Sequence, residues 1–345
     1  MKALVLMRYI FSALLTASLL ILPARAADPA LIAAAQKEGE VIWYTAFIVN
    51  QLVRPASDAF EKLYGVKVKH IRANASDIAL RIINEGKAGK VQSDVFDSTT
   101  GTAALKKAGM VEKFIPPNVA HFPKEMLDPE GYWVAVNSYI LAPAVNTSMI
   151  PRDQWPKTLE DFLDPRWQGK IAWSTSLSSG GAPGFIATVI KEYGEAKGMD
   201  YLRRLALQKP ININAAARRV TDRMIAGEFP LALQIFNNQP VSSARQGAPV
   251  AWLPVQPVTA SLNGISVTKG APHPNAARLF VEFMVSAEGQ KIVAANDYIP
   301  ADPDTPAADP DMKPDGKSLR AQYFNPEELE AGMSGWADVF NQLFR

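Results

Sequence analysis

Short strand-like segments and longer helix-like segments alternate regularly along the first third of the chain. The strand-like segments, residues 40–44, 66–70 and 93–97, are apolar runs or alternate apolar with polar side chains. Segments with helical spacing of apolar residues lie around them, at residues 29–38, 53–64, 77–86 and 102–108. This alternation predicts an α/β fold in which helices cover a parallel sheet.

Ligands of such sheets bind at the carboxyl ends of the strands. Here those ends are residues 44–48 and 97–100, so we expect both loops to face a binding site. The candidate ligand-binding residues in these loops are Tyr44, Thr45, Phe47, Ile48, Ser98 and Thr99. Packing alone offers another explanation for three of them, because Tyr44 could be a buried structural residue and Phe47 and Ile48 could belong to the core.

A loop of small polar residues and glycines, residues 174–184, leads into a helical segment at residues 185–193. Serine hydroxyls and free N–H groups at a helix N-terminus can hold an anion, and glycine lets the anion approach the backbone. An ordinary capped loop has the same composition, so the spacing alone leaves both interpretations open. The loop is not a P-loop, because no Gly-Lys-Ser/Thr follows it.

The first 26 residues have the layout of a secretory signal peptide. Lys2 and Arg8 flank an apolar run, residues 9–23, which ends in Ala24-Arg25-Ala26. This run is too short and too often interrupted by hydroxyl side chains for a stable membrane anchor. We therefore expect export to the periplasm and cleavage after Ala26.

Removal of this leader leaves 319 of 345 residues, more than a single hydrophobic core usually supports, so two lobes are expected. It takes away three of the 36 basic residues and none of the 34 acidic ones, which lowers the net charge from +2 to near −1. Without a Lys/Arg cluster, such a chain is not expected to bind nucleic acid or anionic lipid. The sequence has no cysteine, which excludes disulfides and a cysteine-linked lipid anchor.

Five motifs follow one another along the chain: Trp-Tyr-Thr-Ala46, Ser-Asp-Val-Phe-Asp-Ser98, Asp-Pro-Arg-Trp-Gln-Gly-Lys170, Gly-Glu-Phe-Pro-Leu-Ala-Leu233 and Pro-Asn-Ala-Ala-Arg-Leu-Phe-Val-Glu-Phe283. In this order and spacing they resemble the solute-binding proteins of bacterial ABC importers, in particular the ferric-iron-binding type. The resemblance covers nearly the whole chain after the leader. It implies two α/β lobes, joined by crossing strands, that close around a solute and deliver it to an inner-membrane ABC permease.

The resemblance also implies where a ferric ion would bind. Members that bind iron hold it with a His, a Glu and two adjacent Tyr, which suit a hard cation. The matching positions in this sequence are Ile48, Thr99, Asn237 and Asn238. None of these side chains supplies an anionic oxygen, so we expect neither an iron site nor a metal cofactor. Iron binding through non-standard ligands is the alternative.

The anion half of that site is retained. The family holds the anion that accompanies iron with Ser-Gly-Ala at the start of a helix in the second lobe, and Ser179-Gly180-Gly181, preceded by Ser178, matches it. A groove that loses the metal ligands and keeps this loop suggests that an organic anion is the solute. Apolar and amide side chains near it, such as Phe236, fit a carboxylate, phosphonate or phosphate ester with an apolar portion.

Two further segments are weaker candidates. Arg218 could pair with a carboxylate of the ligand, although a solvated charge at a helix end is the commoner fate. Residues 137–139, near the first crossing between lobes, could contact the ligand or form the hinge. The candidates expected from the second lobe are therefore Ser178, Ser179, Gly180, Gly181, Arg218, Asn237 and Asn238.

Catalysis is not expected of this chain. It has no thiol nucleophile, and its histidines, His70, His121 and His273, lie outside the candidate loops. It contains neither a Gly-x-Ser-x-Gly elbow nor a His-Glu-x-x-His motif. An enzyme on the same fold stays as a second alternative, which a turnover assay would reveal, because a receptor releases its ligand unchanged.

The lobe boundaries follow from these assignments. We expect lobe I to comprise residues 27–138 and 262–312, and lobe II residues 139–261 and 313–345, in a monomer. Closure should occur by rotation about the crossings near residues 138–146 and 255–264. The Pro- and Asp-rich tract at residues 300–317 is predicted to be an exposed connection. Residues 326–343 are predicted to form helices that pack against lobe II.

Overall fold

The computed structural model describes residues 27–178 and 180–345. The expected leader with its cleavage site, and Ser179, lie outside the described residues. The strands are β1 (Glu40–Thr45), β2 (Lys67–Arg72), β3 (Val95–Ser98), β4 (Val134–Asn146), β5 (Ile171–Ser174), β6 (Ile211–Ile213), β7 (Leu231–Phe236), β8 (Val250–Trp252), β9 (Val258–Val267), β10 (Ile299–Pro300) and β11 (Ala321–Phe324). They form one mixed sheet with the main order β2-β1-β3-β9-β4-β7-β5-β6.

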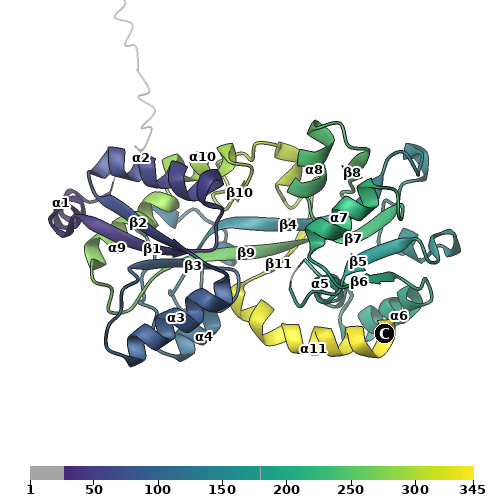
Figure 1. The fold of residues 1–345 in the computed structure, drawn as a ribbon, viewed down its shortest axis with the longest axis horizontal. Coiled ribbons are helices and arrows are strands. Elements are labelled where there is room, and N and C mark those ends of the chain that lie inside the picture. The colour runs from purple at the N-terminus through teal and green to yellow at the C-terminus, as the bar shows by residue number, and fades with distance from the viewer. Residues whose placement is uncertain (1–26, 179) are drawn as a thin grey trace, which may run out of the picture.

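Helices flank this sheet in both lobes (Figure 1). They are α1 (Pro29–Glu38), α2 (Arg54–Tyr64), α3 (Ala75–Lys87), α4 (Thr102–Lys107), α5 (Ala182–Tyr193), α6 (Glu195–Ala206), α7 (Ala217–Ile225), α8 (Asn238–Arg245), α9 (Pro274–Met284), α10 (Ala287–Ala295) and α11 (Pro326–Phe344). None of the helices in the described part of the chain is long and apolar enough to cross a membrane.

The predicted alternation is confirmed in lobe I. Strand β1 pairs in parallel with β2 and with β3, and each strand lies within two residues of its predicted bounds. Helix α1 is capped at both ends by its sequence. The Asp28 carboxylate before it accepts from the Ala30 N–H at 2.9 Å, and Gly39 after it has φ +78°.

Strands β4 and β9 are the long crossing strands between the lobes. They pair antiparallel, from Val134 opposite Ile265 to Leu141 opposite Thr259. In lobe I, β9 also pairs with β3, and in lobe II, β4 also pairs with β7 and β8. In Figure 1 both strands run from one lobe into the other, as the resemblance implies.

Separate hydrophobic clusters fill the two lobes. The cluster of lobe I includes Trp43, Phe60 and Phe280, whereas that of lobe II includes Phe162 and Trp173. This separation supports the lobe boundaries given above, which stay a proposal. The tract at residues 300–317 is less exposed than expected, because Ala307, Met312 and the following Leu319 are buried against Ile140, Ala260 and their neighbours in the crossing strands.

Helix α11 also departs from expectation, since it is a single helix that contacts both lobes (Figure 1). At its start, Glu327 accepts from the Lys106 ammonium at 3.0 Å and from the Trp133 indole at 3.1 Å, both in lobe I. Near its end, the Phe340 and Phe344 rings pack on Trp173 of lobe II. A helix of this length spans roughly 28 Å, enough to bridge the lobes.

Candidate functional site

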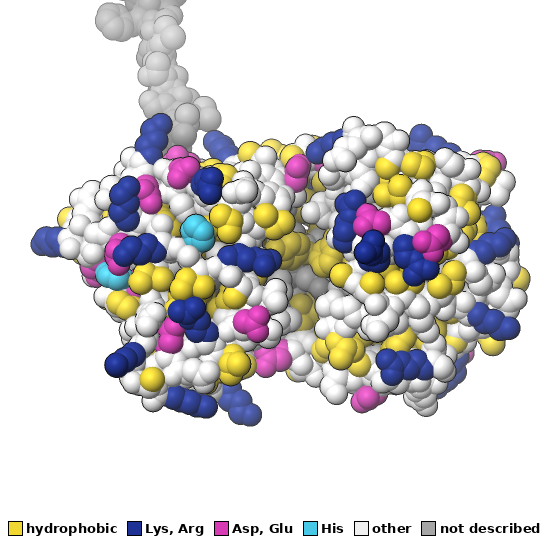
Figure 2. Space-filling model, viewed as in Figure 1, with side chains coloured by type: hydrophobic (Ala, Val, Ile, Leu, Met, Phe, Trp, Pro, Cys, Tyr) yellow, Lys and Arg dark blue, Asp and Glu magenta, His cyan; other side chains and the backbone are white. Residues whose placement is uncertain are grey.

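A groove separates the two lobes on the face shown in Figure 2, with hydrophobic side chains on its walls and Lys and Arg side chains on both sides. The crossing strands pass beneath it. Because side chains alternate between the two faces of a strand, Asn137, Tyr139, Ser261 and Asn263 share one face. We call these four residues the hinge floor. The opposite face, with Ile140 and Ala260, is the one covered by Met312 and Leu319.

Two aromatic contacts place the hinge floor on the groove side. The Tyr139 ring packs against Phe236 at 5.9 Å and against Tyr298 at 6.1 Å between centroids. Phe236 leads into α8 in lobe II, and Tyr298 lies under the first-strand loop in lobe I. Burial raises the pKa of Tyr139 well above its usual value, so its hydroxyl is a neutral donor and acceptor.

The first-strand loop is largely structural. Tyr44 is buried beneath α3, and its hydroxyl donates to the Glu85 carboxylate at 2.6 Å. Burial and this carboxylate raise the Tyr44 pKa. Phe47 is buried between Trp43 and Tyr298. These two side chains therefore pack in the core in this conformation, as the packing explanation predicts, and a ligand contact at either of them stays a prediction.

A buried carboxylate, that of Asp97, fixes this loop from below. It accepts from the Trp43 indole at 2.9 Å, the Ala46 N–H at 3.3 Å and the Asn263 amide at 3.4 Å. Burial raises the pKa of Asp97 to about 6, against the lowering effect of these donors and of the Thr45 hydroxyl. Thr45 is itself fully buried, so it supports the loop from within, while Ile48 is 55% exposed.

The side chains of the second loop of lobe I, residues 97–100, are also partly buried or already hydrogen-bonded. Ser98 is buried, and its hydroxyl accepts from the Thr100 N–H at 3.1 Å. Thr99 is half-buried at the loop surface. The N–H of Gly101, which has φ +86°, donates to Glu330 of α11 at 3.1 Å. Thr99 and Ile48 are thus the candidate side chains of lobe I that stay accessible.

The glycine loop of lobe II is tightly packed at its backbone. A Cβ atom at Gly180 would lie 2.6 Å from the Phe236 ring, and one at Gly181 would lie 2.0 Å from the Ser176 carbonyl oxygen. Gly181 caps α5, and Ser178 is half-buried with its hydroxyl 3.3 Å from that of Ser176. Only glycine fits at position 181, where the clash is with the backbone, whereas a side chain at position 180 would displace the Phe236 ring. The loop thus lies against Phe236 at the rim of the hinge floor.

The turn from β7 into α8 carries the two asparagines. Asn237 is 2% exposed, and its amide nitrogen has no hydrogen-bond partner among the described residues. Asn238 lines a pocket of about 180 Å³ together with Arg218. Arg218 is exposed and donates to Asp222 at 2.8 Å, one turn along α7. Arg218 is thus a solvated charge at the edge of a pocket in this structure, and a ligand contact of its guanidinium stays a prediction.

That pocket contains a contact between lobes. The Arg245 guanidinium of α8 donates to Asp297 of lobe I at 3.3 Å, and Gln51 from the same lobe completes the pocket wall. Both charged side chains are about half exposed. The pair therefore bridges the groove at its surface.

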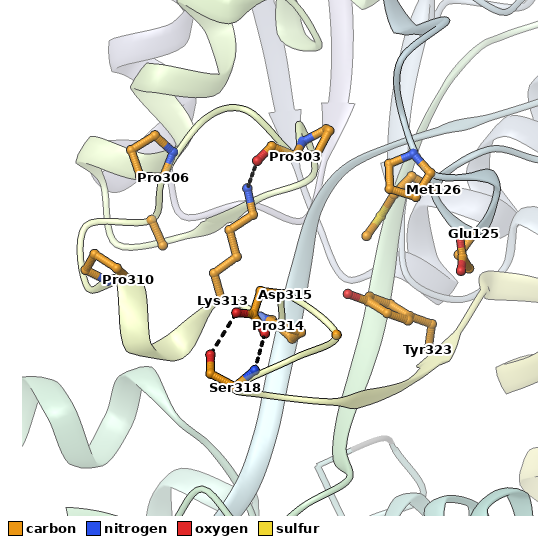
Figure 3. A pocket seen from close by; sticks show the side chains of 13 residues that line it. Glu125, Met126, Pro303, Pro306, Pro310, Lys313, Pro314, Asp315, Ser318 and Tyr323 are labelled. Carbon is orange, nitrogen blue, oxygen red and sulfur yellow. Dashed lines mark hydrogen bonds between the residues drawn. The ribbon is translucent and has the colours of Figure 1, made fainter.

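A second pocket, of about 490 Å³, lies on the Pro-rich tract (Figure 3). None of the candidate residues lines it. Its Lys313 ammonium donates to the carbonyl oxygens of Asp302 and Thr305, and Asp315 accepts from Ser318 at 2.8 Å. Because these charged groups are already paired, we assign no ligand to this pocket.

Among the residues that the structure describes, metal ligands do not gather in the groove. Among residues 27–178 and 180–345, the one group of three His, Cys, Asp or Glu side chains close enough to share a metal is His121, Asp302 and Asp304. None of these three belongs to a candidate loop. The expected iron positions, Ile48, Thr99, Asn237 and Asn238, hold no carboxylate, imidazole or phenol.

Sequence reasoning missed one contributor to the site. Tyr298 lies next to Tyr139, although 159 residues separate them in the chain, and no local pattern marks it. Asn137 belongs to the segment at residues 137–139, for which the sequence left ligand contact and hinge both open. The strand Val134–Asn146 also contains the polar residues Ser138 and Asn146, and only the register shows that Asn137 shares a face with Tyr139, Ser261 and Asn263.

The family model of the bacterial extracellular solute-binding proteins matches residues 93–323, more than half of the chain. The chain belongs to this family. This solute-binding protein is 22% identical to the Fe(3+)-binding periplasmic protein of Serratia marcescens over 279 residues, 76% of this chain and 78% of that protein. Its prediction as a binding protein rather than an enzyme is confirmed.

Solved structures show the same fold. Iron-bound HitA from Pseudomonas aeruginosa superposes with a TM-score of 0.70 at 24% identity, over 88% of this chain and 99% of that chain. AfuA from Actinobacillus pleuropneumoniae, with fructose-6-phosphate bound, gives 0.68 at 23% identity, over 89% and 98%. The predicted two-lobe fold is confirmed. Binding proteins of this family deliver their ligands to ABC permeases.

Proposed function

We propose that this solute-binding protein captures a small organic anion, such as a carboxylate, phosphonate or phosphate ester, between its lobes. The observation that carries this proposal is the glycine loop at the start of α5. A Cβ atom at Gly181 would clash with the Ser176 carbonyl oxygen, and one at Gly180 would displace the Phe236 ring. The Gly181 N–H already donates to the Ser178 carbonyl oxygen at 3.0 Å, so the positive end of the α5 helix dipole is the feature that favours a negatively charged group.

The side chains at the iron positions support an anion over a ferric ion. A trivalent cation requires anionic oxygen ligands, and Ile48, Thr99, Asn237 and Asn238 provide none. The fold itself favours neither solute, since HitA is iron-bound and AfuA is bound to a phosphate ester. The preference for an organic anion therefore rests on the residues of this chain.

Capture would proceed by closure of the lobes about β4 and β9. In this proposal lobe I consists of residues 27–138 and 262–312, and lobe II of residues 139–261 and 313–345. The two lobes are connected by crossing strands whose register shifts between Ala135 and Asn137, a position where rotation is easily accommodated. The protein would act as a monomer in the periplasm, after removal of its leader.

Thermal unfolding of residues 27–345 tests the proposal with fructose 6-phosphate, methylphosphonate, benzoate, citrate and ferric citrate as probes. A ligand at 100 times its Kd stabilises a protein by about 2.7 kcal/mol, which raises the Tm by a few degrees at this size. We expect a shift with at least one organic anion and none that depends on iron. A shift with ferric citrate but not with citrate would contradict the proposal.

A matched pair of serine variants tests whether the anion that shifts the Tm binds at the glycine loop. Ser178→Ala removes a hydroxyl from the glycine loop and should reduce the shift. Ser148→Ala removes one from an exposed turn of the same lobe and should leave it unchanged. Equal shifts in both variants would place the anion away from the loop.

A further inference from the structure

The hinge floor contains polar groups that have no hydrogen-bond partner among residues 27–178 and 180–345. Asn137 is 0% exposed, and neither its amide oxygen nor its amide nitrogen has a hydrogen-bond partner among the described residues. The Ser261 hydroxyl, also 0% exposed, lacks a partner in the same part of the chain. Leaving such groups unpaired is unfavourable, so a ligand group that pairs with them gains binding free energy.

The strand register brings these groups together. Asn137 lies opposite Asn263, and Ser261 lies opposite Tyr139, so Asn137 and Ser261 are diagonal neighbours on one face of the β4–β9 pair. The Asn137 amide lies near the Tyr139 hydroxyl and opposes the rise of its pKa, but reaches no partner at hydrogen-bonding geometry. Asn263 is occupied by Asp97. The unsatisfied groups therefore form one small polar patch.

This patch is continuous with the glycine loop. The Gly180 backbone lies against the Phe236 ring, and that ring packs against Tyr139, which stands beside Asn137 and Ser261. Asn237, directly after Phe236, is 2% exposed and adds an amide nitrogen that has no partner within the described part of the chain. A row of contacts thus leads from the anion loop to the hinge floor.

We propose that Asn137 and Ser261 bind an uncharged polar part of the solute, so that the solute is a hydroxylated organic anion, of the kind represented by sugar or polyol phosphates and hydroxy acids. This inference rests on the proposed function and adds a second recognition element to it. An Asn side chain donates and accepts at once, as a serine hydroxyl does, and a solute hydroxyl satisfies both. No cation is needed at this end of the solute.

The opposite face of β9 provides an internal contrast. Ser266 is 2% exposed, and its hydroxyl also lacks a partner among the described residues. It lies five positions after Ser261, so alternation turns it to the other face of the strand. Ser261→Ala and Ser266→Ala therefore remove similar groups from one strand, but only the first lies on the hinge floor.

The experiment compares sn-glycerol 3-phosphate with n-propyl phosphate, which share the phosphate and differ in two hydroxyl groups. Calorimetric titrations of residues 27–345 are made for the unaltered protein and for Asn137→Leu, Ser261→Ala and Ser266→Ala. Neutral glycerol is titrated as well. We expect the unaltered protein to prefer the hydroxylated ester by roughly tenfold or more, which corresponds to one or two hydrogen bonds.

The variants are expected to separate the two faces. Asn137→Leu and Ser261→Ala should lose this preference, whereas Ser266→Ala should keep it. Without ligand, Asn137→Leu should unfold at the same temperature as the unaltered protein or higher, because it removes unpaired polar groups.

Two results would overturn the inference while the proposed function stands: equal binding of both esters, or an unchanged preference in Asn137→Leu. A lower Tm of the ligand-free Asn137→Leu protein would also overturn the inference, whichever ester binds. It would show that the Asn137 amide is already satisfied, by buried water. Binding of glycerol but of neither ester would support recognition of hydroxyl groups by the hinge floor. It would contradict the proposal that the solute is an anion.

Discussion

The two sides of the groove use their polar groups differently. On lobe I, the Tyr44 hydroxyl is bonded to Glu85, Phe47 is packed on Tyr298, and Asp97 holds the loop through three donors. On lobe II and the hinge, Gly180 presents bare backbone, and Asn237 and Asn137 keep unpaired amide groups among the described residues. A ligand gains most from groups that the protein leaves unsatisfied. On the proposed function, we therefore expect recognition to be concentrated on lobe II and the hinge floor.

On the proposed function, this difference would also explain how a protein of this family acts as a receptor without iron. The positions that the resemblance assigns to the lobe I ligands of iron are Ile48 and Thr99, so that side would serve as a supporting wall. The glycine loop of lobe II would need no metal, because the positive end of the α5 helix dipole attracts an anion. Variants on each side test whether this division is real.

The largest effect is expected at the glycine loop. Gly180→Leu would place its Cβ 2.6 Å from the Phe236 ring and fill the approach to the backbone, so we predict the loss of measurable anion binding in calorimetry. Gly335→Leu is the matched control, because this exposed position on α11 has open space around it. Retained anion affinity in Gly180→Leu would show that the glycine loop of lobe II does not bind the anion.

The next effect is on stability in lobe I. Phe47→Ala removes a buried ring between Trp43 and Tyr298 and should lower the free energy of unfolding by roughly 3–5 kcal/mol in urea denaturation. Its neighbour Ile48 is 55% exposed, so Ile48→Ala should change that free energy by less than about 0.5 kcal/mol. A small loss in Phe47→Ala together with weaker anion binding would show that Phe47 is a ligand contact.

Asp97 gives a prediction on pH. Its pKa rises from 3.8 in the unfolded chain to about 6 in the folded protein, so the folded state binds the proton more tightly. Stability is then greatest below pH 4 on this account and falls as the pH rises to 6, by up to about 3 kcal/mol. Urea unfolding between pH 4 and 7 measures how the free energy of unfolding changes with pH. Asp97→Asn should remove the part of this change that is due to the Asp97 carboxyl group. An identical slope in both proteins would contradict the assignment.

The smallest effect is expected at Tyr44. Tyr44→Phe deletes the hydrogen bond to Glu85 and should lower the free energy of unfolding by about 1 kcal/mol, because Glu85 keeps Arg81 and the Gln92 N–H as partners. Anion affinity should not change. A tenfold loss of affinity with unchanged stability would return Tyr44 to the binding site.

The sequence predicted the architecture better than the site. Strand and helix positions follow from hydrophobic periodicity, and the motifs indicate the crossing between lobes. Periodicity also separates Trp43 from Tyr44 on opposite faces of β1, but does not tell which of the two faces the ligand. That choice depends on Glu85, and the fate of Phe47 depends on Tyr298, contacts that join distant segments of the chain.

The same limit applies to α11 and to Asn137. The apolar pattern of α11 predicts a helix, yet its bridging position depends on Lys106 and Trp133, which lie more than 190 residues earlier. Asn137 stands out only once the register places it beside Ser261 with no partner among the described residues. Distances between remote segments are what local patterns cannot supply.

Hydrogen–deuterium exchange of residues 27–345, with and without the organic anion that gives the largest thermal shift, tests the division of the groove most directly. The account predicts new protection at residues 176–184, 235–238 and 137–141, with little change at residues 44–48, whose contacts are already made. Protection confined to residues 44–48 and 97–100 would contradict it, because recognition would then lie on lobe I.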